Sequence, residues 1–235
     1  MTRRRWIADE VSGNRAALTG DHARHLAQVL RAEVGQEFDI STGAEVRCGK
    51  IISVDLDRVE FELGAAIAQS QGAEITVAIS IFKFDRMEWA IEKCVELGVA
   101  QIVPVIAGRT EKHLAAAVAK RVDRWRRIAR QAAEQSRRGS SPEIAEPIKF
   151  KELLALKGET RIVLSEVEQD GMLKDAIPPV ANSVLLAFGP EGGWTEKEFA
   201  AFREARWTSA SLGSTILRAE TAVIAALAVV ASVLQ

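Results

Sequence analysis

Two segments near the end of the chain contain residue types that could do chemistry, and the first is the loop at 189–194. It reads Gly-Pro-Glu-Gly-Gly-Trp and follows an apolar run at 183–188 that is typical of a strand. Thr195 and Glu198 form a capping-box pattern, which predicts a helix directly after the loop. Glycines at a strand-to-helix junction let a ligand approach the backbone closely, although a tight turn that needs glycine gives the same pattern.

Glu191 within this loop narrows the class of ligand. The loop matches neither GxxxxGKS/T nor GxGxxG, the glycine patterns that hold nucleotide phosphates. A carboxylate inside the loop would also repel a triphosphate or a pyrophosphate. The segment therefore favours a neutral or cationic nucleoside ligand.

The second segment, 211–222, reads Ser-Leu-Gly-Ser-Thr-Ile-Leu-Arg-Ala-Glu-Thr-Ala and follows a predicted strand at 208–212. Because the carboxyl ends of parallel strands share one edge of a sheet, we expect this loop to lie beside the first. Arg218 and Glu220 stand where an apolar helix begins. They could form an ion pair or a first-turn charge, or the arginine could be aimed at a polar substrate.

A basic stretch precedes these loops. Residues 109–138 contain ten basic and three acidic residues, whereas the whole chain has 31 basic and 32 acidic residues. A local positive surplus suits a polyanionic partner such as RNA, although a basic helix face is often only solvated. The stretch ends in Ala-Glu-Gln-Ser-Arg-Arg at 133–138, followed by a Gly-Ser-Ser-Pro stop.

The N-terminal third must supply a different architecture. Helical spacing predicts one short helix over 19–31, and short β-type runs separated by turns predict a small β-barrel or sheet over 37–63. Residues 64–73 are small and polar, which indicates a linker and a domain boundary near residue 72.

Beyond residue 72 strands alternate with helices, which predicts an α/β domain with a mainly parallel sheet. The expected strands are 75–82, 102–106, 161–165, 183–188 and 208–212, and the expected helices include one over 115–138. A helix around 87–95 should end at Gly98.

Composition excludes several classes of protein. Hydrophobic residues make up 48% and charged residues 27%, which excludes disorder and fibres. The longest apolar run, 222–234, is shorter than the roughly 20 residues of a membrane-spanning helix, and the basic start lacks the apolar stretch of an export signal. Two cysteines and three histidines, scattered along the chain, predict no disulfide framework and no metal site, as suits the cytoplasm.

Taken together, these motifs resemble the bacterial 16S rRNA uridine-N3 methyltransferase family, a branch of the SPOUT (trefoil-knot) methyltransferases that use S-adenosyl-L-methionine. The specific matches are Gly-Pro-Glu-Gly-Gly at 189–193 and the 212–222 segment. Supporting matches are Arg-Arg-Arg-Trp at 3–6, His25-Leu26, 29–31, Lys83 with 85–88, 93–99 and Glu-Gln-Ser at 134–136.

The resemblance implies a PUA-like β-barrel over 1–72 that binds RNA, and a SPOUT α/β trefoil-knot domain over 73–235 that binds the cofactor and dimerises. It implies an S-adenosylmethionine-dependent rRNA methyltransferase whose partner is 16S rRNA in the small ribosomal subunit. The protein would be a cytoplasmic homodimer, with no membrane partner and no metal.

Three loops carry the cofactor residues that the resemblance implies: Leu164, Ser165, Glu166, Phe188, Gly189, Pro190, Glu191, Gly192, Gly193, Leu212, Gly213, Ile216 and Leu217. The predicted RNA contacts are Arg3, Arg4, Arg5, His25, Arg31, Arg137 and Arg138. Two positions depart from the family pattern. Trp194 stands where phenylalanine is common, and Thr215 where arginine is common, which puts a role for that cation in doubt.

Methylation at N3 requires loss of a weakly acidic imide proton, so the enzyme mainly positions and polarises its substrate. No histidine follows His113, so the candidate proton acceptors are Glu191, Glu220 or solvent assisted by Arg218. We hypothesise that Arg218 stabilises the uridine anion. The alternatives are a SPOUT enzyme acting on a ribose 2′-hydroxyl or on tRNA, and a non-catalytic ribosome-assembly protein. A nicotinamide-dependent oxidoreductase is disfavoured because GxGxxG is missing.

Overall fold

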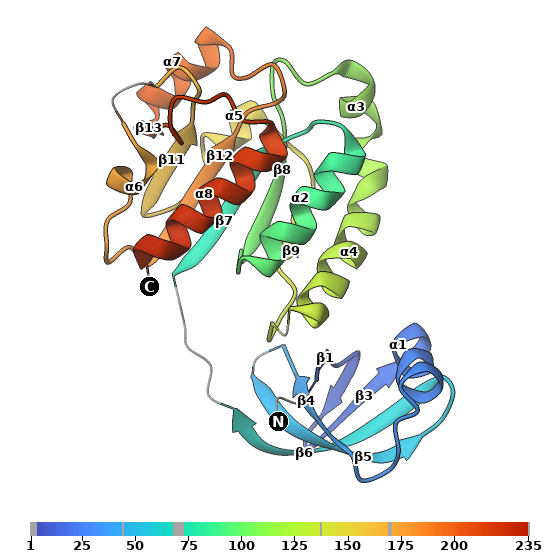
Figure 1. Ribbon diagram of the computed structural model, residues 1–235. Coiled ribbons are helices and arrows are strands. Elements are labelled where there is room, and N and C mark those ends of the chain that lie inside the picture. The colour runs from blue at the N-terminus through green and yellow to red at the C-terminus, as the bar shows by residue number, and fades with distance from the viewer. Residues whose placement is uncertain (1–3, 44, 68–72, 137, 169–170, 235) are drawn as a thin grey trace. The chain divides into compact units, whose positions relative to one another are not determined.

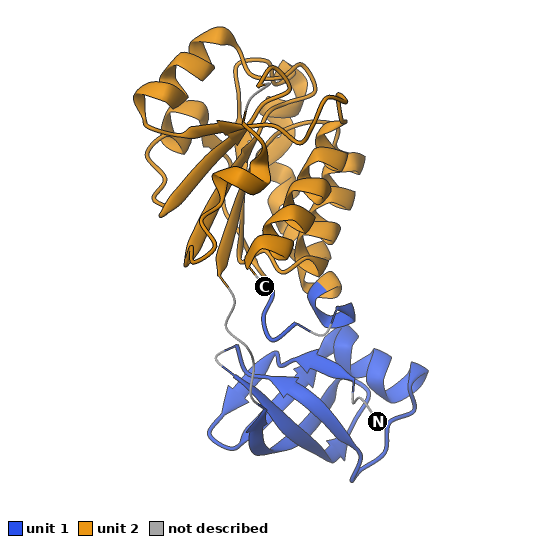
Figure 2. Cartoon of the chain, turned by 60° about the vertical axis from the view of Figure 1, so that its left-hand side comes forward, with its two compact units in different colours: residues 1–71, 133–141 blue, residues 72–132, 142–235 orange. Residues whose placement is uncertain are grey.

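The chain forms two compact units in a computed structural model, which describes all residues except 1–3, 44, 68–72, 137, 169–170 and 235. The N-terminal unit comprises residues 1–71 and 133–141, and the C-terminal unit comprises 72–132 and 142–235 (Figure 2). The sequence did not indicate that the segment 133–141 belongs with the N-terminal unit.

A six-stranded sheet that curls on itself forms the N-terminal unit, with strand order β1-β4-β5-β6-β3-β2 (Figure 1). Its pairs are antiparallel except for β1 with β4, which is parallel. The strands are β1 (Arg5–Ile7), β2 (Glu10–Ser12), β3 (Arg15–Thr19), β4 (Glu37–Ser41), β5 (Val46–Val54) and β6 (Arg58–Ile67). The small β-type unit predicted over 37–63 is present.

The predicted linker is wrong at its start, because β6 continues through residues 64–67. There the small residues pair with β5, and a side chain on Gly64 would press on the carbonyl oxygen of Cys48. Small side chains at these positions therefore allow β5 and β6 to pack closely. Residues 68–72 of the predicted linker lie outside the described residues.

The single helix predicted over 19–31 is also wrong in detail. A short α1 (Gly20–Arg24) passes into the π-helical turn η1 (His25–Val29), whose Leu26 is buried with Ala23 in the core. Trp6, Ile40 and Phe61 belong to the same core. Single π-helical turns within helices are frequent at functional sites.

The C-terminal unit contains a parallel sheet with order β10-β8-β7-β12-β11-β13, and β9 pairs with β8. Within the described residues the strand pairs of this sheet are parallel, as predicted. The strands are β7 (Glu74–Ser80), β8 (Gln101–Ile106), β9 (Glu143–Ile144), β10 (Ile148–Lys149), β11 (Thr160–Leu164), β12 (Ser183–Phe188) and β13 (Thr208–Ala210).

The helices of this unit are α2 (Phe84–Glu96), α3 (Lys112–Ala117), the 3₁₀ turn η2 (Val118–Arg121), α4 (Val122–Gln135), α5 (Phe150–Leu153), α6 (Leu173–Ala176), α7 (Glu196–Glu204) and α8 (Ala219–Leu234). Three of them, α2, α7 and α8, lie where the sequence predicted helices. Gly98, with φ of +91°, follows α2 as expected. The helix predicted over 115–138 is instead divided by η2, which buries Val118 between the two helices.

An aromatic cluster anchors the loop that follows β12. Trp194 packs on Phe202 of α7 with ring centroids 5.0 Å apart, and Phe150 and Trp207 contact the same Phe202 ring. The substitution of tryptophan for phenylalanine at 194 is thus absorbed in the core. Over the described residues, no helix is long and apolar enough to span a membrane, and no group of three or more potential metal ligands exists.

Candidate active site

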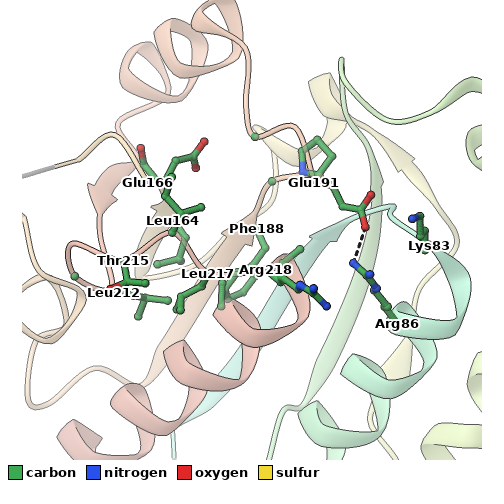
Figure 3. Close-up of a pocket in the computed structure, with 18 residues that line it drawn as sticks. Lys83, Arg86, Leu164, Glu166, Phe188, Glu191, Leu212, Thr215, Leu217 and Arg218 are labelled. Atoms are coloured by element: carbon green, nitrogen blue, oxygen red, sulfur yellow. Dashed lines mark hydrogen bonds and ion pairs between the residues drawn. The ribbon is translucent and has the colours of Figure 1, made fainter.

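A cavity of about 470 Å³ lies where β11, β12 and β13 reach their carboxyl ends. Its walls are the three predicted loops and the start of α2, which contributes Lys83 and Arg86 (Figure 3). Twelve of the thirteen residues predicted to hold the cofactor line this cavity, and only Gly192 does not. The parallel topology therefore brings together residues that are about 50 positions apart in the sequence.

Arg109, which the sequence analysis did not single out, holds the loop at 189–194 in shape. Its guanidinium donates to the carbonyl oxygens of Gly192 at 2.6 Å and Trp194 at 3.2 Å. Gly193 has φ of +68°, and a side chain there would also collide with the Glu166 carboxylate. The backbone conformation is the main requirement for glycine at 193, because the exposed Glu166 side chain can move aside. Gly192 supports the loop through its carbonyl instead of lining the cavity.

Glu198 fixes the exit of the same loop. Its buried carboxylate accepts hydrogen bonds from the backbone N–H of Gly108 at 2.7 Å and from the N–H and hydroxyl of Thr195, both at 2.8 Å. The Thr195 hydroxyl in turn accepts from the Glu198 N–H, which completes the predicted capping box. The Glu198 carboxylate, which accepts from three donors, therefore connects the loop after β8 to the start of α7.

The two candidate proton acceptors share one arginine. Nη1 of Arg86 lies 3.1 Å from Oε1 of Glu191, and its Nε lies 3.7 Å from Oε1 of Glu220. Glu220 is only 7% exposed, and among the described residues its Oε2 has no hydrogen-bond partner. The ion pair considered between Arg218 and Glu220 is not formed, because Arg86 takes that place. The sequence signal that could have identified Arg86 is its place in the 85–88 motif.

Arg218 and Lys83 also line the cavity, and no ion pair involves either of them in the part of the chain that the structure describes. Figure 3 shows Lys83, Arg86, Arg218 and Glu191 toward one end, with Glu166, Leu212 and Thr215 toward the other. Glu220 does not line the cavity. The cavity thus has a cationic end and a less charged end, a division that the sequence did not predict.

The predicted RNA contacts lie in the N-terminal unit, except that Arg3 and Arg137 fall outside the described residues. Arg4, His25 and Arg31 are exposed. Arg5 is half-buried with a guanidinium nitrogen 3.8 Å from Asp39. The contacts of these four side chains with RNA stay a prediction.

Two aromatic contacts bring part of this set together. The Trp6 ring of β1 lies 5.8 Å from the His25 ring and 6.2 Å from the His22 ring. His22 stands between Asp9 at 3.3 Å and Glu134 at 3.5 Å. The Glu-Gln-Ser motif at 134–136 therefore contributes a carboxylate to the N-terminal unit. Arg138 is half-buried there, and burial lowers the pKa of its guanidinium.

Comparison with known proteins adds independent information. Residues 68–231 match the family model described as an RNA methyltransferase domain. The ribosomal RNA small subunit methyltransferase E of Bacillus subtilis is 31% identical over 228 residues, which cover 91% of this chain and 88% of the relative. The protein of the same name from Synechocystis is 32% identical over 93% of this chain and 73% of its own length.

Solved structures give the same result. The ribosomal RNA small subunit methyltransferase E of Neisseria gonorrhoeae, bound to S-adenosyl methionine, is 30% identical with a TM-score of 0.86, over 99% of this chain and 98% of that one. A putative methyltransferase of Legionella pneumophila, in complex with the same cofactor, is 27% identical with a TM-score of 0.85, over the same shares of the two chains. The likeness confirms the predicted fold class, an α/β SPOUT fold preceded by a small β-barrel.

Proposed function

This chain belongs to the ribosomal RNA small subunit methyltransferase E family, and on that premise we propose that it methylates N3 of a uridine in 16S rRNA of the small ribosomal subunit. The methyl donor is S-adenosyl-L-methionine. The observation that carries the proposal is the cavity at the sheet edge, where three loops meet and one end is cationic. Its volume of about 470 Å³ lies within the range of small-molecule sites.

The residues that line the cavity fit this cofactor. Gly189 and Gly193 leave backbone accessible, and the Glu166 carboxylate, at the end away from the three cations, suits a positively charged ligand (Figure 3). Phe188, Leu164 and Leu217 would contact the apolar parts of the nucleoside. When bound, the cofactor supplies an activated methyl group on a sulfonium.

Arg218 would stabilise the negative charge that develops on the uracil as N3 loses its proton. Arg218 lines the cavity and has no ion pair within the described residues, so its guanidinium is available to a substrate oxygen. Glu191 lines the cavity and is our candidate proton acceptor. Glu220 acts through Arg86, because it pairs with the same guanidinium that contacts Glu191.

The N-terminal unit would bind the RNA. The uridine must be unpaired or flipped out, because its N3 edge is hidden in a base pair. We propose that Arg4, Arg5, His25, Arg31 and Arg138 contact the RNA backbone, and assign the same role to Arg3 and Arg137. This corresponds to a PUA-like domain over 1–72 and a SPOUT domain over 73–235.

Labelled S-adenosylmethionine and small ribosomal subunits test the reaction directly. Nucleoside analysis of the digested 16S rRNA should find the label in 3-methyluridine. Label in a ribose-methylated nucleoside or in tRNA would assign the chain to another SPOUT activity. No label in any fraction, with the cofactor still bound, would support the non-catalytic assembly role.

We also propose that the protein works in the cytoplasm as a homodimer, in which the SPOUT domain supplies the interface. Size-exclusion chromatography with light scattering measures this. A mass of twice 25.6 kDa is expected, and a monomer at the concentration used for the activity assay would contradict it.

A further inference from the structure

The cationic end of the cavity contains more positive charge than the ion pairs there neutralise. Arg86 is paired with Glu191 and Glu220. Lys83 and Arg218 line the same cavity, and no ion pair joins either of them to a described carboxylate. Unpaired cations beside a binding cavity favour an anionic ligand at that end.

The backbone at Lys83 is held firmly, although its side chain is exposed. Ile81 and Phe82, which precede it, are buried, and the N–H of Met87 donates to the carbonyl oxygen of Lys83 at 2.9 Å. The residue therefore stands at a fixed point between β7 and α2. Lys83 is the N-cap residue of α2 and so stands at the positive end of the helix dipole, where Asp85 is the acidic residue of the first turn and no side chain caps the backbone.

The methyl donor accounts for only part of this charge. Its single carboxylate could engage one cation, and its sulfonium is itself positive and gains nothing from three neighbouring cations. If Arg218 faces the uracil and Arg86 stays with its two glutamates, Lys83 is the cation that remains for either the cofactor carboxylate or an RNA phosphate. The RNA brings the missing anion, since each nucleotide carries one phosphate and lysine binds phosphate as a compact point charge.

Resting on the proposed function, we propose that Lys83 binds a backbone phosphate next to the target uridine, so that this end of the cavity is a nucleotide subsite. Such a contact carries no sequence information and fixes the register of the strand. Arg86 is then a positioning residue, because it holds Glu191 and Glu220 and leaves Lys83 and Arg218 to the RNA.

Salt dependence gives a readout that a structural role would not change. We would measure binding of small ribosomal subunits at 50–200 mM KCl, with S-adenosylhomocysteine present, for the full chain and for Lys83→Gln. Loss of one phosphate contact should reduce the magnitude of the slope of log K against log salt concentration by about 0.7–0.9. The ratio of the binding constants of the full chain and the variant should then change about threefold across this range. Lys83→Arg should keep the slope.

Lys157→Gln is the matched control, because Lys157 is exposed and lies outside the cavity. Its slope should equal that of the unaltered protein. An unchanged slope for Lys83→Gln would overturn the proposal. Weaker binding of S-adenosylmethionine with an unchanged slope would also overturn it, and would indicate that Lys83 binds the cofactor carboxylate.

The reaction assay separates this inference from the function on which it rests. If the unaltered protein forms no 3-methyluridine and Lys83→Gln still lowers the slope, the phosphate contact stands and the uridine-N3 reaction fails. If 3-methyluridine forms and the slope is unchanged, the reaction stands and the subsite fails.

Discussion

The cavity of the C-terminal unit and the predicted RNA surface of the N-terminal unit were expected from the same resemblance. The predicted cofactor residues come together in one cavity, whereas the predicted RNA residues differ in exposure. Twelve predicted cofactor residues from three separate loops line one cavity. The described RNA candidates are mixed, since Arg4, His25 and Arg31 are exposed whereas Arg5 and Arg138 are half-buried. Parallel strands bring their following loops to one edge, and no such rule gathers arginines on a curled sheet.

The largest expected effect tests the cavity side of this comparison. Arg218→Ala should lower the single-turnover rate of methyl transfer on saturating small subunits by about 10²–10³-fold, because a preorganised donor is lost. Binding of S-adenosylmethionine should change little. Arg203→Ala, an exposed arginine of α7 outside this cavity, is the control. A full rate for Arg218→Ala would remove Arg218 from the mechanism.

Glu198 tests whether the cavity depends on its buried support. Glu198→Ala leaves the N–H groups of Gly108 and Thr195 without their acceptor. We expect the free energy of unfolding of the C-terminal unit to fall by about 1–3 kcal/mol, measured by calorimetry. Glu196→Ala, an exposed neighbour, should cost far less. Equal losses would show that the capping-box carboxylate does not hold the loop.

Two glycines with positive φ, one in each unit, sharpen the comparison. Gly193→Ala at φ of +68° should weaken binding of S-adenosylmethionine by roughly 5–30-fold, because a left-handed alanine costs about 1–2 kcal/mol. Gly13→Ala at φ of +56° carries the same backbone cost, with open space around the new methyl group. It should leave cofactor binding unchanged in a titration calorimeter. An equal loss in both variants would mean that the effect is not local to the cavity.

Two arginines of the N-terminal unit can be compared: Arg31, which has no ion pair with a described residue, and Arg24, which is paired. Arg24 is bonded to Asp21 and Asp57, which raises the pKa of its guanidinium. Arg31→Gln should lower the salt slope of subunit binding by about 0.7–0.9, while Arg24→Gln should leave it unchanged. Cofactor affinity should stay the same in both. A lower slope for Arg24→Gln alone would mean that Arg24, and not Arg31, contacts the RNA.

The smallest effect concerns the two thiols, one in each unit. Cys94 is fully buried, and burial raises the pKa of its thiol, whereas Cys48 is half-buried. One thiol of two should react with iodoacetamide in the native protein, and both after denaturation. Because the native thiol stays neutral, it stabilises the fold below the unfolded pKa of about 9, and this contribution is lost as the pH rises further. Native labelling at Cys94 would contradict the buried position.

Much of the fold follows from local pattern. The apolar run at 183–188 became β12 with the same bounds, and the capping box at Thr195 formed as expected. These signals depend on neighbouring residues alone, so the sequence carries them. The predicted linker failed because Gly64 packs against the distant strand β5, which neighbouring residues do not reveal. The single helix predicted over 115–138 failed because the chain tightens into η2, where Val118 is buried.

The sequence by itself determined the family, the three loops and the helix and strand types, because motif spacing and periodicity are properties of the chain. Only the tertiary structure decided the charge relations of the site. Arg86 pairs with Glu220, which the sequence offered to Arg218, and with Glu191, and Lys83 joins the same cavity from 135 positions earlier in the chain than Arg218. Ion pairs depend on distances of a few ångströms, and spacing along a chain does not encode such distances.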